Sequence, residues 1–329
     1  MQPERRIDVG VIGVGSMGRQ HARVYAGLSE ANLVGVFDVD DERAARVADE
    51  HGTTAIDLES LLASVDAASI AVPTVHHYDI AVQCLEAGVA MLIEKPLVTN
   101  IEEGRRLRSR ANRADVAVQV GHVERFNPAV VTLRKIVEDL SIISIHAERL
   151  GPPPNRRIDD SAVLDLMIHD IDVVLSLLDE SPTSVKSTGV NDNRHASALL
   201  EFDSGIMASL TASRLTQRKV RRLTVTAREC LVELDYIAQS IAIHRNSVPK
   251  YAERDGNVRF QHESVVERPH VPNEEPLRNE LEAFVDAVAS NETPLVTIDD
   301  GLAALELTHQ IEAQALGDRS NIGVRVADD

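Results

Sequence analysis

Aromatic residues and lysine are both scarce in this chain of 329 residues. Aromatics make up 3% of it, Trp is absent, and only five of its 34 basic residues are Lys. Against these stand 52 acidic residues, which give a formal net charge of −18. Such a charge argues against nucleic acid as the main partner. An acidic, Lys-poor surface suits high salt, while a GC-rich genome also favours Arg, so both explanations stay open.

Cysteine and long apolar runs are also lacking. The two cysteines, Cys84 and Cys230, are too few for a disulfide framework or a four-ligand zinc site, and the His spacing predicts no metal site. No apolar run approaches the ~20 residues that a membrane helix needs. The segment from Met1 to Asp8 lacks the apolar stretch of a signal peptide. We therefore expect a cytoplasmic, metal-free globular enzyme that binds no membrane.

The first 125 residues do contain a regular alternation of strand and helix patterns. Repeated βαβ units require a parallel sheet with helices on both faces. The expected strands are Ile7–Gly13, Asn32–Asp38, Ala67–Val72, Ala90–Ile93 and Ala117–Val123. The expected helices are Met17–Leu28, Glu42–His51, Val75–Ala87 and one that Asn100 caps and that runs to about Arg113.

The pattern changes in the second half of the chain. An alternating segment, Ile142–Glu148, and a helix, Ser161–Leu178, precede a run of short strand-like segments that ends near Ile243. Asp203–Gly205 is a hairpin turn signal within that run. The last two expected elements are the helices Leu277–Ala289 and Gly301–Leu316.

These patterns predict an α/β protein of two domains. Residues 1–123 are expected to form a doubly wound parallel sheet that binds a nucleotide. Residues 124–329 are expected to form an α+β domain with a mostly antiparallel open sheet, which binds substrate and mediates oligomerisation. The C-terminal helices could pack back on the first domain.

A glycine-rich motif follows the first strand and identifies the nucleotide. Residues 13–18 read Gly-Val-Gly-Ser-Met-Gly, and Asp38 ends the next strand 20 residues after Gly18. The glycines let backbone N–H groups approach a pyrophosphate, and Asp38 can accept hydrogen bonds from ribose hydroxyls. Because Asp38 would repel a 2′-phosphate and Val39 follows it, NAD is favoured over NADP. The predicted NAD-binding residues of this Rossmann domain are Gly13, Gly15, Ser16, Met17, Gly18 and Asp38.

Glu94, Lys95 and Pro96 follow the strand that ends at Ile93. Open α/β sheets place ligands at the carboxyl ends of their strands, so a Lys there can hydrogen-bond a substrate hydroxyl. An incidental surface Lys is the alternative, but a chain with five lysines makes that alternative weaker.

At this point the chain resembles the Gfo/Idh/MocA family of NAD(P)-dependent sugar and cyclitol oxidoreductases. The matching segments are GVIGVGSMGRQHARVY, AVPTVHHYDIAVQCLEAG and EKPLV, and the resemblance extends over essentially the whole chain. It implies that Lys95 is catalytic, and it leaves open a cis peptide between Lys95 and Pro96. By the same resemblance the nicotinamide side of the cofactor site includes Pro73, Thr74, His77, Glu94 and Lys95. For His77, a structural role at a helix start is an equal alternative.

Asp165 and His169 form the second family motif, DxxxH. Residues at i and i+4 share one helix face, so both side chains can point into one cleft. The resemblance implies that His169 and Lys95 move the hydroxyl proton of a secondary alcohol while its hydride passes to nicotinamide. Asp165 would anchor a sugar hydroxyl. The alternative is a core histidine beside a polar outer face.

Two further segments narrow the substrate. GHVERFNP at 121–128 and ERLGPPPNRR at 148–157, with DLMIHDIDVV, resemble the subgroup of UDP-N-acetylglucosamine 3-dehydrogenases, whose 3-keto product feeds amino-sugar biosynthesis. A diphosphate requires guanidinium or amide donors. Arg125, Asn127, Arg149 and Arg156 are therefore predicted to bind the substrate, and the family resemblance adds Asp165 and His169 of the DxxxH motif.

Three points stay open. A dehydrogenase of a free sugar or inositol would need no diphosphate site, and a non-catalytic NAD-binding regulator would not need Lys95, Asp165 and His169 together. The resemblance also implies a homo-oligomer that associates through the second sheet, either a dimer or a tetramer.

Overall fold

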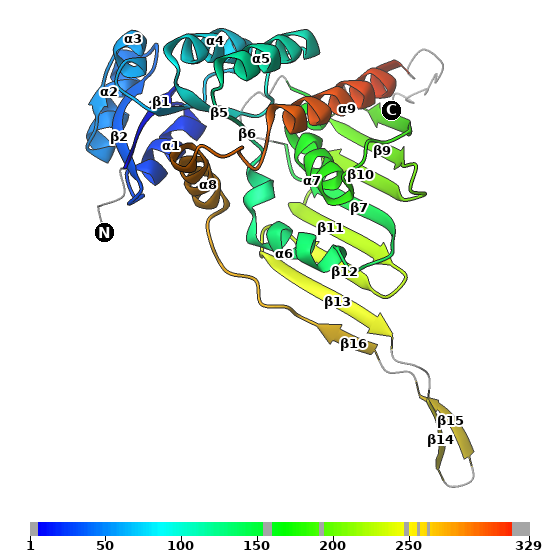
Figure 1. Ribbon diagram of the computed structural model, residues 1–329. Coiled ribbons are helices and arrows are strands. Elements are labelled where there is room, and N and C mark those ends of the chain that lie inside the picture. The colour runs from blue at the N-terminus through cyan, green and yellow to red at the C-terminus, as the bar shows by residue number, and fades with distance from the viewer. Residues whose placement is uncertain are drawn as a thin grey trace, which may run out of the picture. The chain divides into compact units, whose positions relative to one another are not determined.

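The computed structural model describes residues 6–153, 160–190, 194–246, 250–254, 257–261 and 264–317 (Figure 1). The chain folds into two compact units. One contains Met1–Phe126 and Glu274–Glu306, and the other contains Asn127–Asn273 and Leu307–Asp329. Each unit is therefore built from two separate stretches of sequence.

A six-stranded parallel sheet forms the centre of the first unit, and its strand order is β3-β2-β1-β4-β5-β6. Its strands are β1 (Ile7–Ile12), β2 (Ala31–Phe37), β3 (Thr54–Ala55), β4 (Ala67–Ile70), β5 (Ala90–Glu94) and β6 (Val118–Gly121). Every residue of β4, β5 and β6 is buried, as a parallel sheet covered on both faces requires. The predicted doubly wound sheet is thus confirmed. Its order reverses between β1 and β4, and ligands bind beside such a switch point.

The helices of this unit follow the expected alternation. They are α1 (Ser16–Tyr25), α2 (Asp41–His51), α3 (Leu58–Leu62), the short η1 (Thr74–His76), α4 (His77–Ala87), α5 (Ile101–Ala114), η2 (Val123–Phe126) and α8 (Pro276–Ser290). Asn100 caps α5 as predicted, because its side chain accepts the N–H of Glu103. Leu281 and Phe284 of α8 belong to the same buried cluster as Val9 of β1, so this late helix completes the core of the first unit.

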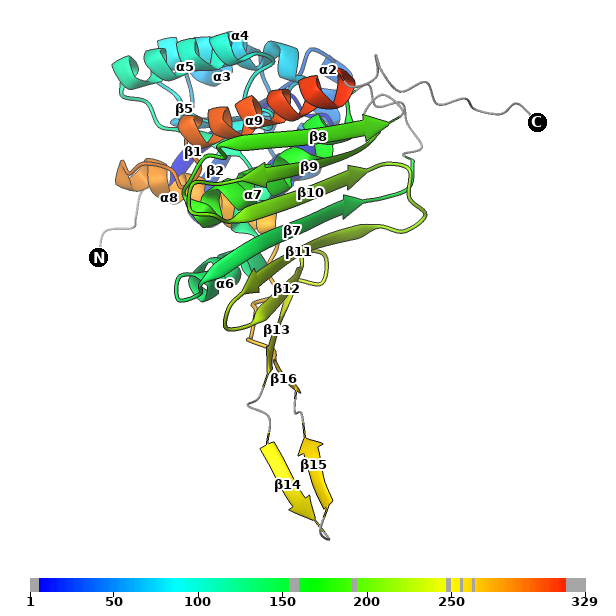
Figure 2. The same ribbon diagram turned by 90° about the vertical axis from the view of Figure 1, so that its right-hand side faces the viewer.

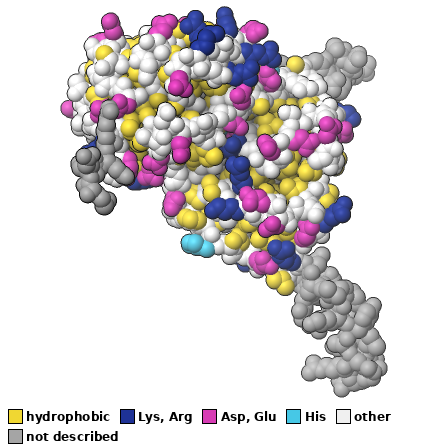
Figure 3. All heavy atoms as spheres, viewed as in Figure 1, with side chains coloured by type: hydrophobic (Ala, Val, Ile, Leu, Met, Phe, Trp, Pro, Cys, Tyr) yellow, Lys and Arg dark blue, Asp and Glu magenta, His cyan; other side chains and the backbone are white. Residues whose placement is uncertain are grey.

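A basic surface lies over α4 and α5, where Figure 3 shows a gathering of Lys and Arg side chains. Three of the five arginines of α5 have acidic neighbours within the unit. Arg105 pairs with Glu306 at 3.0 Å and Arg110 lies 3.8 Å from Glu86. The positive face of α5 is thus partly neutralised by its neighbours.

An eight-stranded sheet forms the second unit, with the order β16-β13-β12-β11-β7-β10-β9-β8. Its strands are β7 (Ile142–Leu150), β8 (Ser184–Val190), β9 (His195–Glu201), β10 (Met207–Ser213), β11 (Val220–Ala227), β12 (Leu231–Asp235), β13 (Ser240–Asn246) and β16 (Ser264–Glu267). β7 and β10 are parallel, whereas all the other neighbours are antiparallel, which confirms the predicted mostly antiparallel sheet. The expected turn Asp203–Gly205 joins β9 to β10, and Gly205 has a positive φ of 82°.

Helices α6 (Pro128–Val137) and α7 (Ile168–Leu178) cover one face of this sheet, and in Figure 2 they lie behind it. Alternate residues of β7, such as Ile145 and Ala147, are buried on that face. A separate hairpin pairs β14 (Lys250–Arg254) with β15 (Asn257–Gln261), and α9 (Ile298–Gly317) closes the described chain. Among the described residues, none of the helices combines the length and the apolarity that a membrane crossing requires.

Candidate active site

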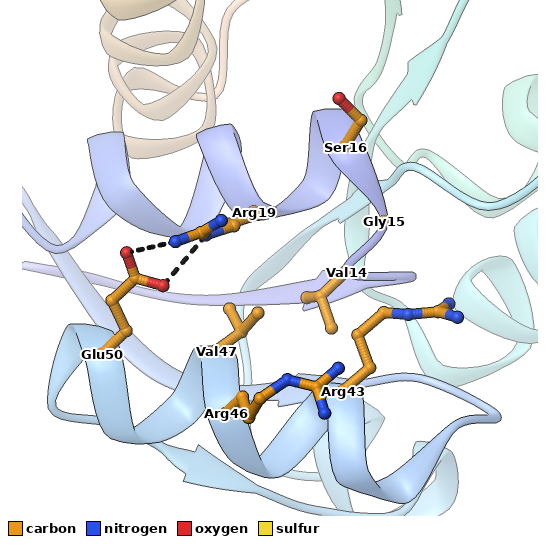
Figure 4. Close-up of a pocket in the computed structure, with 8 residues that line it drawn as sticks. All are labelled: Val14, Gly15, Ser16, Arg19, Arg43, Arg46, Val47 and Glu50. Carbon is orange, nitrogen blue, oxygen red and sulfur yellow. Dashed lines mark hydrogen bonds and ion pairs between the residues drawn. The ribbon is translucent and has the colours of Figure 1, made fainter. Parts of the chain in front are cut away.

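The glycine motif forms a tight connection between β1 and α1 (Figure 4). Gly13 has a φ of +83°, a conformation that glycine adopts without steric cost. A Cβ on Gly18 would lie 1.8 Å from the carbonyl oxygen of Gly13, so only glycine permits this packing. At Gly15, in contrast, a Cβ would meet no atom within 4 Å.

These three glycines therefore have different uses. Gly13 and Gly18 are required by the fold, while Gly15 leaves open space directly before the N-terminus of α1. That helix end presents unpaired backbone N–H groups and a partial positive charge, which suit a pyrophosphate. The loop thus fits the diphosphate of NAD.

Asp38 lies beside this loop and is almost fully buried. Its Oδ2 accepts the N–H of Val14 at 2.9 Å, and its Oδ1 accepts the N–H of Asp40 at 2.9 Å. Arg43 of α2 also contacts this carboxylate, with Nη1 3.2 Å from Oδ1. These contacts hold Asp38 next to the glycine loop, where a bound ribose would meet it. Sequence reasoning missed Arg43, although its position in the first turn of α2, the helix that follows Asp38, places it near that carboxylate.

His77, at the start of α4, connects the segments that follow β4 and β5. Its Nε2 lies 3.0 Å from the carbonyl oxygen of Val72, and its Nδ1 lies 3.0 Å from that of Pro96. Burial lowers the pKa of His77 despite these carbonyls, so the neutral ring with its single N–H is favoured. These contacts are those of a structural residue, and a contact between His77 and the cofactor stays a prediction. Nearby, Thr74 is half-buried and Pro73 exposed.

The Lys95–Pro96 peptide is cis, which answers the question that the sequence left open.

Glu94, the last residue of β5, is buried. Its Oε1 lies 2.9 Å from Nε2 of His21, and its Oε2 accepts the N–H of Lys95 at 3.2 Å. Burial acts to raise the pKa of Glu94, but the hydrogen bond and charge of His21 and the charge of Lys95 outweigh it. The pKa of Glu94 therefore lies below its ordinary value. A carboxylate that is ionised at neutral pH thus adjoins the half-buried Lys95.

In the second unit, a π-helical turn precedes α7. This turn, Val163–Met167, contains Asp165, whereas His169 lies in the first turn of α7. The sequence predicted one α-helix over Ser161–Leu178, so the π turn corrects the first part of that helix. Such turns are rare and often occur at functional sites. Both Asp165 and His169 are half-buried.

Arg214, which follows β10, binds Asp165. Its Nη2 donates to Oδ2 of Asp165, and its Nη1 donates to the carbonyl oxygen of Asp160. Because Arg214 is itself buried, this ion pair compensates the charge of Asp165 and fixes its carboxylate. Sequence reasoning missed Arg214, since no motif connects it with a residue 49 positions earlier.

The predicted substrate-binding arginines have partners of their own. Arg149 donates from Nε and Nη2 to the two oxygens of Asp170 at 2.9 and 2.8 Å, and its guanidinium lies over the ring of Tyr236 at 4.9 Å. Arg125 is buried, with Nη2 3.9 Å from Asp300. Arg156 lies outside the described residues.

Asn127 has the contacts of a helix cap. Its Oδ1 accepts the N–H of Ala129 at 3.1 Å, and its Nδ2 donates to the carbonyl oxygen of Tyr236 at 3.2 Å. These bonds fix the start of α6. Substrate contacts of Asn127, Arg125 and Arg149 stay predictions.

Comparisons with known proteins support the two-part organisation. Residues 7–122 match the oxidoreductase family with an NAD-binding Rossmann fold, and residues 138–232 match the GFO/IDH/MocA C-terminal domain. The chain is 34% identical to UDP-N-acetylglucosamine 3-dehydrogenase of Acidithiobacillus ferrooxidans over 86% of this chain and 88% of the relative. It is 27% identical to inositol 2-dehydrogenase of Rhizobium meliloti over 91% and 93%. A solved structure of the Acidithiobacillus enzyme, GnnA, has a TM-score of 0.87 at 31% identity and covers 95% of this chain and 98% of that one.

Proposed function

Because the chain belongs to the Gfo/Idh/MocA family of NAD-binding oxidoreductases, we propose that it oxidises the 3-hydroxyl of UDP-N-acetylglucosamine to a ketone. The observation that carries this proposal is the 34% identity to the Acidithiobacillus enzyme over 86% of the chain. The inositol 2-dehydrogenase matches at 27% over a similar length. The 3-keto sugar nucleotide would then be a substrate for amino-sugar biosynthesis.

NAD, when bound, supplies the hydride acceptor at its nicotinamide ring. The loop Gly13–Gly18, with Ser16 and Met17 at the start of α1, would hold its diphosphate, while Asp38 would accept hydrogen bonds from the adenosine ribose. Pro73 and Thr74, after β4, would flank the nicotinamide half. The chain's own residues thus bind and orient the cofactor.

The proton of the substrate hydroxyl needs a separate acceptor. We assign it to a ring nitrogen of His169, because imidazole transfers protons efficiently near neutral pH. Lys95 would donate a hydrogen bond from Nζ to the same hydroxyl oxygen and stabilise the charge that develops there. Asp165, fixed by Arg214, would accept a hydrogen bond from a neighbouring sugar hydroxyl. Glu94 would hold the backbone of Lys95 by accepting its N–H, and its negative charge would attract the Lys95 ammonium group.

Oxidation of a free sugar or inositol is the second candidate, and two observations favour it. The first is that inositol dehydrogenases are among the relatives. The second is that Arg149 already donates two hydrogen bonds to Asp170, so fewer of its N–H groups are left for a diphosphate. The two candidates differ in whether the UDP group contributes to binding.

Absorbance at 340 nm distinguishes them. The protein should be incubated with NAD and, in parallel, with UDP-N-acetylglucosamine, UDP-glucose, free N-acetylglucosamine and myo-inositol. A ketone-trapping reagent is included to draw the reaction toward NADH. We expect NADH to form with UDP-N-acetylglucosamine and far less with the free sugar. A strong signal from inositol without one from UDP-N-acetylglucosamine would overturn the proposal.

We further propose that the protein is a homo-oligomer that associates through the sheet face opposite α6 and α7. Small polar side chains such as Ser197, Ser209 and Thr211 lie on this face and are partly buried, and Ser197 and Thr211 bond across β9 and β10 at 3.0 Å. Leu199 and Met207 are exposed on the same face and add apolar area of the kind that homodimer interfaces bury. Light scattering should give a dimer or tetramer that Thr211→Arg weakens, and a monomeric wild type would contradict this.

A further inference from the structure

Basic residues are concentrated in the connection between β10 and β11 and at the start of β11. Four of the six residues from 217 to 222 are basic, whereas the whole chain has 34 basic residues among 329. These four are Arg218, Lys219, Arg221 and Arg222, and all of them line one cavity of about 180 Å³. A group of this kind raises the local electrostatic potential on a chain whose net charge is −18.

The positive charge of this cavity is only partly compensated. Of the described residues that line it, only Asp235 is acidic, and its Oδ2 lies 3.7 Å from Nε of Arg222. Arg221 donates from Nη1 to two backbone carbonyl oxygens, which carry no net charge. Arg218 and Lys219 are exposed, and neither forms an ion pair with any residue that the structure describes. These two side chains are therefore available to an anion in the cavity.

The cavity adjoins both segments that the sequence analysis connected with a sugar nucleotide. Nη1 of Arg221 donates at 2.8 Å to the carbonyl oxygen of Leu150, which belongs to the later segment. Nδ2 of Asn127, from the earlier segment, donates at 3.2 Å to the carbonyl oxygen of Tyr236, in the turn that lines the cavity. All of these residues belong to the second unit. The fold thus brings the two segments to the edges of one basic cavity.

The same connection also fixes Asp165, which is expected to hold the sugar. Arg214, directly after β10, donates to the carboxylate of Asp165, and Arg218 follows four residues later. Four residues of fully extended chain span at most about 14 Å, so the Cα atoms of Arg214 and Arg218 lie within that distance. In a sugar nucleotide, a single hexose ring separates the 3-hydroxyl from the diphosphate. A sugar held at Asp165 can therefore direct its diphosphate toward the cavity.

We propose that this cavity binds the diphosphate of a sugar-nucleotide substrate, with Arg218 and Lys219 as its cationic donors. The guanidinium of Arg218 can make bidentate phosphate contacts, and the ammonium of Lys219 adds a second charge. The cavity is smaller than the roughly 300–1,000 Å³ of pockets that enclose a whole small molecule, so it suits one anionic group. Because Asp170 holds Arg149, the unit needs such donors elsewhere. The inference rests on the proposed function for the class of substrate.

Calorimetric titration of the NAD-saturated protein tests the cavity without turnover. UDP and UMP, neither of which carries the hexose, are titrated at low and at high salt. We expect UDP to bind at least about tenfold more tightly than UMP, because its second phosphate adds charge-assisted contacts. Added salt should reduce this difference, since the extra contacts are ionic. UDP binding that is no tighter than that of UMP would overturn the proposal.

Two variants identify the residues. Arg218→Ala and Lys219→Ala each change an exposed residue outside the strands, so both proteins should keep the wild-type melting temperature. Each should weaken UDP binding at least about fivefold and UMP binding less. The matched control is Arg228→Ala, an exposed arginine just beyond the other end of β11, which should leave both affinities unchanged. Wild-type UDP affinity in both cavity variants would contradict the assignment.

Steady-state kinetics separate this inference from the proposed reaction. Arg218→Ala should raise the KM for UDP-N-acetylglucosamine at least about fivefold and leave kcat within about twofold, because the diphosphate is bound equally in the ground state and the transition state. NADH formation from this substrate with a wild-type KM in both variants would overturn the cavity assignment and leave the proposed function standing. UDP binding that both variants weaken, without NADH from UDP-N-acetylglucosamine, would support the cavity and overturn the oxidation of the 3-hydroxyl.

Discussion

His21 and Glu94 form a buried hydrogen bond, with Nε2 of His21 2.9 Å from Oε1 of Glu94. His21 lies on α1, the helix that begins at the glycine loop, and Glu94 ends β5 immediately before Lys95. His21 is fully inaccessible to solvent. This one contact therefore connects the helix of the cofactor loop with the segment that contains the candidate catalytic lysine.

Glu94→Gln should weaken this connection and destabilise the protein at pH 7 by about 1–3 kcal/mol, since it removes the charge that His21 faces in a buried site. The lowered pKa of Glu94 sets the pH dependence. A carboxyl group whose pKa is lower in the folded protein stabilises the fold at pH values above its pKa in the unfolded chain, roughly 4.3. This stabilisation is lost as the pH falls through the pKa that Glu94 has in the folded protein. Urea unfolding of both proteins between pH 7 and about pH 2.5 should show the difference shrinking below roughly pH 4.3. Glu50→Gln, in an exposed pair, is the control, and an equal effect there would contradict the prediction.

The glycine loop offers a test that separates folding from cofactor binding. Gly18→Ala should lower the melting temperature clearly, because the new Cβ would collide with the carbonyl oxygen of Gly13. Gly15→Ala should leave the melting temperature of the free protein nearly unchanged, because its Cβ meets no atom. It should nevertheless weaken NAD binding at least about tenfold by filling the space for the diphosphate. Thermal unfolding with and without NAD measures both effects, and tight NAD binding by Gly15→Ala would refute the assignment.

Lys95→Ala and His169→Ala test the proposed proton transfer. Each should lower kcat by about 10²–10⁴-fold, the usual contribution of a positioned acid–base group. NAD affinity, measured by titration, should change little in comparison. Lys135→Ala, which removes an exposed lysine of α6, is the control and should retain wild-type turnover. Wild-type turnover in either of the first two variants would eliminate the mechanism.

The sequence was sufficient where the controlling interactions are local. Gly13 and Gly18 stand within two turns of each other, and Asn100 caps a helix through a residue three positions away, so their roles can be read from spacing. Alternating strand and helix patterns likewise determine which segments become parallel strands. These features account for the correct fold and for the fit of the cofactor loop.

Contacts between distant segments could not be predicted in this way. Arg214 meets Asp165 across 49 positions, and Arg149 meets Asp170 because β7 and α7 pack together. The sequence alone does not distinguish Arg149 from an arginine that binds a phosphate. Its partner was identified only when the fold brought the buried carboxylate of Asp170 beside it.

Arg149 therefore provides a test of structural against substrate-binding roles. Arg149→Met should destabilise the protein by about 3–5 kcal/mol, because it leaves the charge of Asp170 buried without its partner. Adding Asp170→Asn should recover much of that loss, since the double variant removes both charges, and denaturant unfolding of the two proteins measures the recovery. If Arg149 instead binds a diphosphate, Arg149→Met should keep its stability and raise KM for UDP-N-acetylglucosamine, with no recovery from Asp170→Asn. A variant that is both stable and unchanged in KM would contradict both roles.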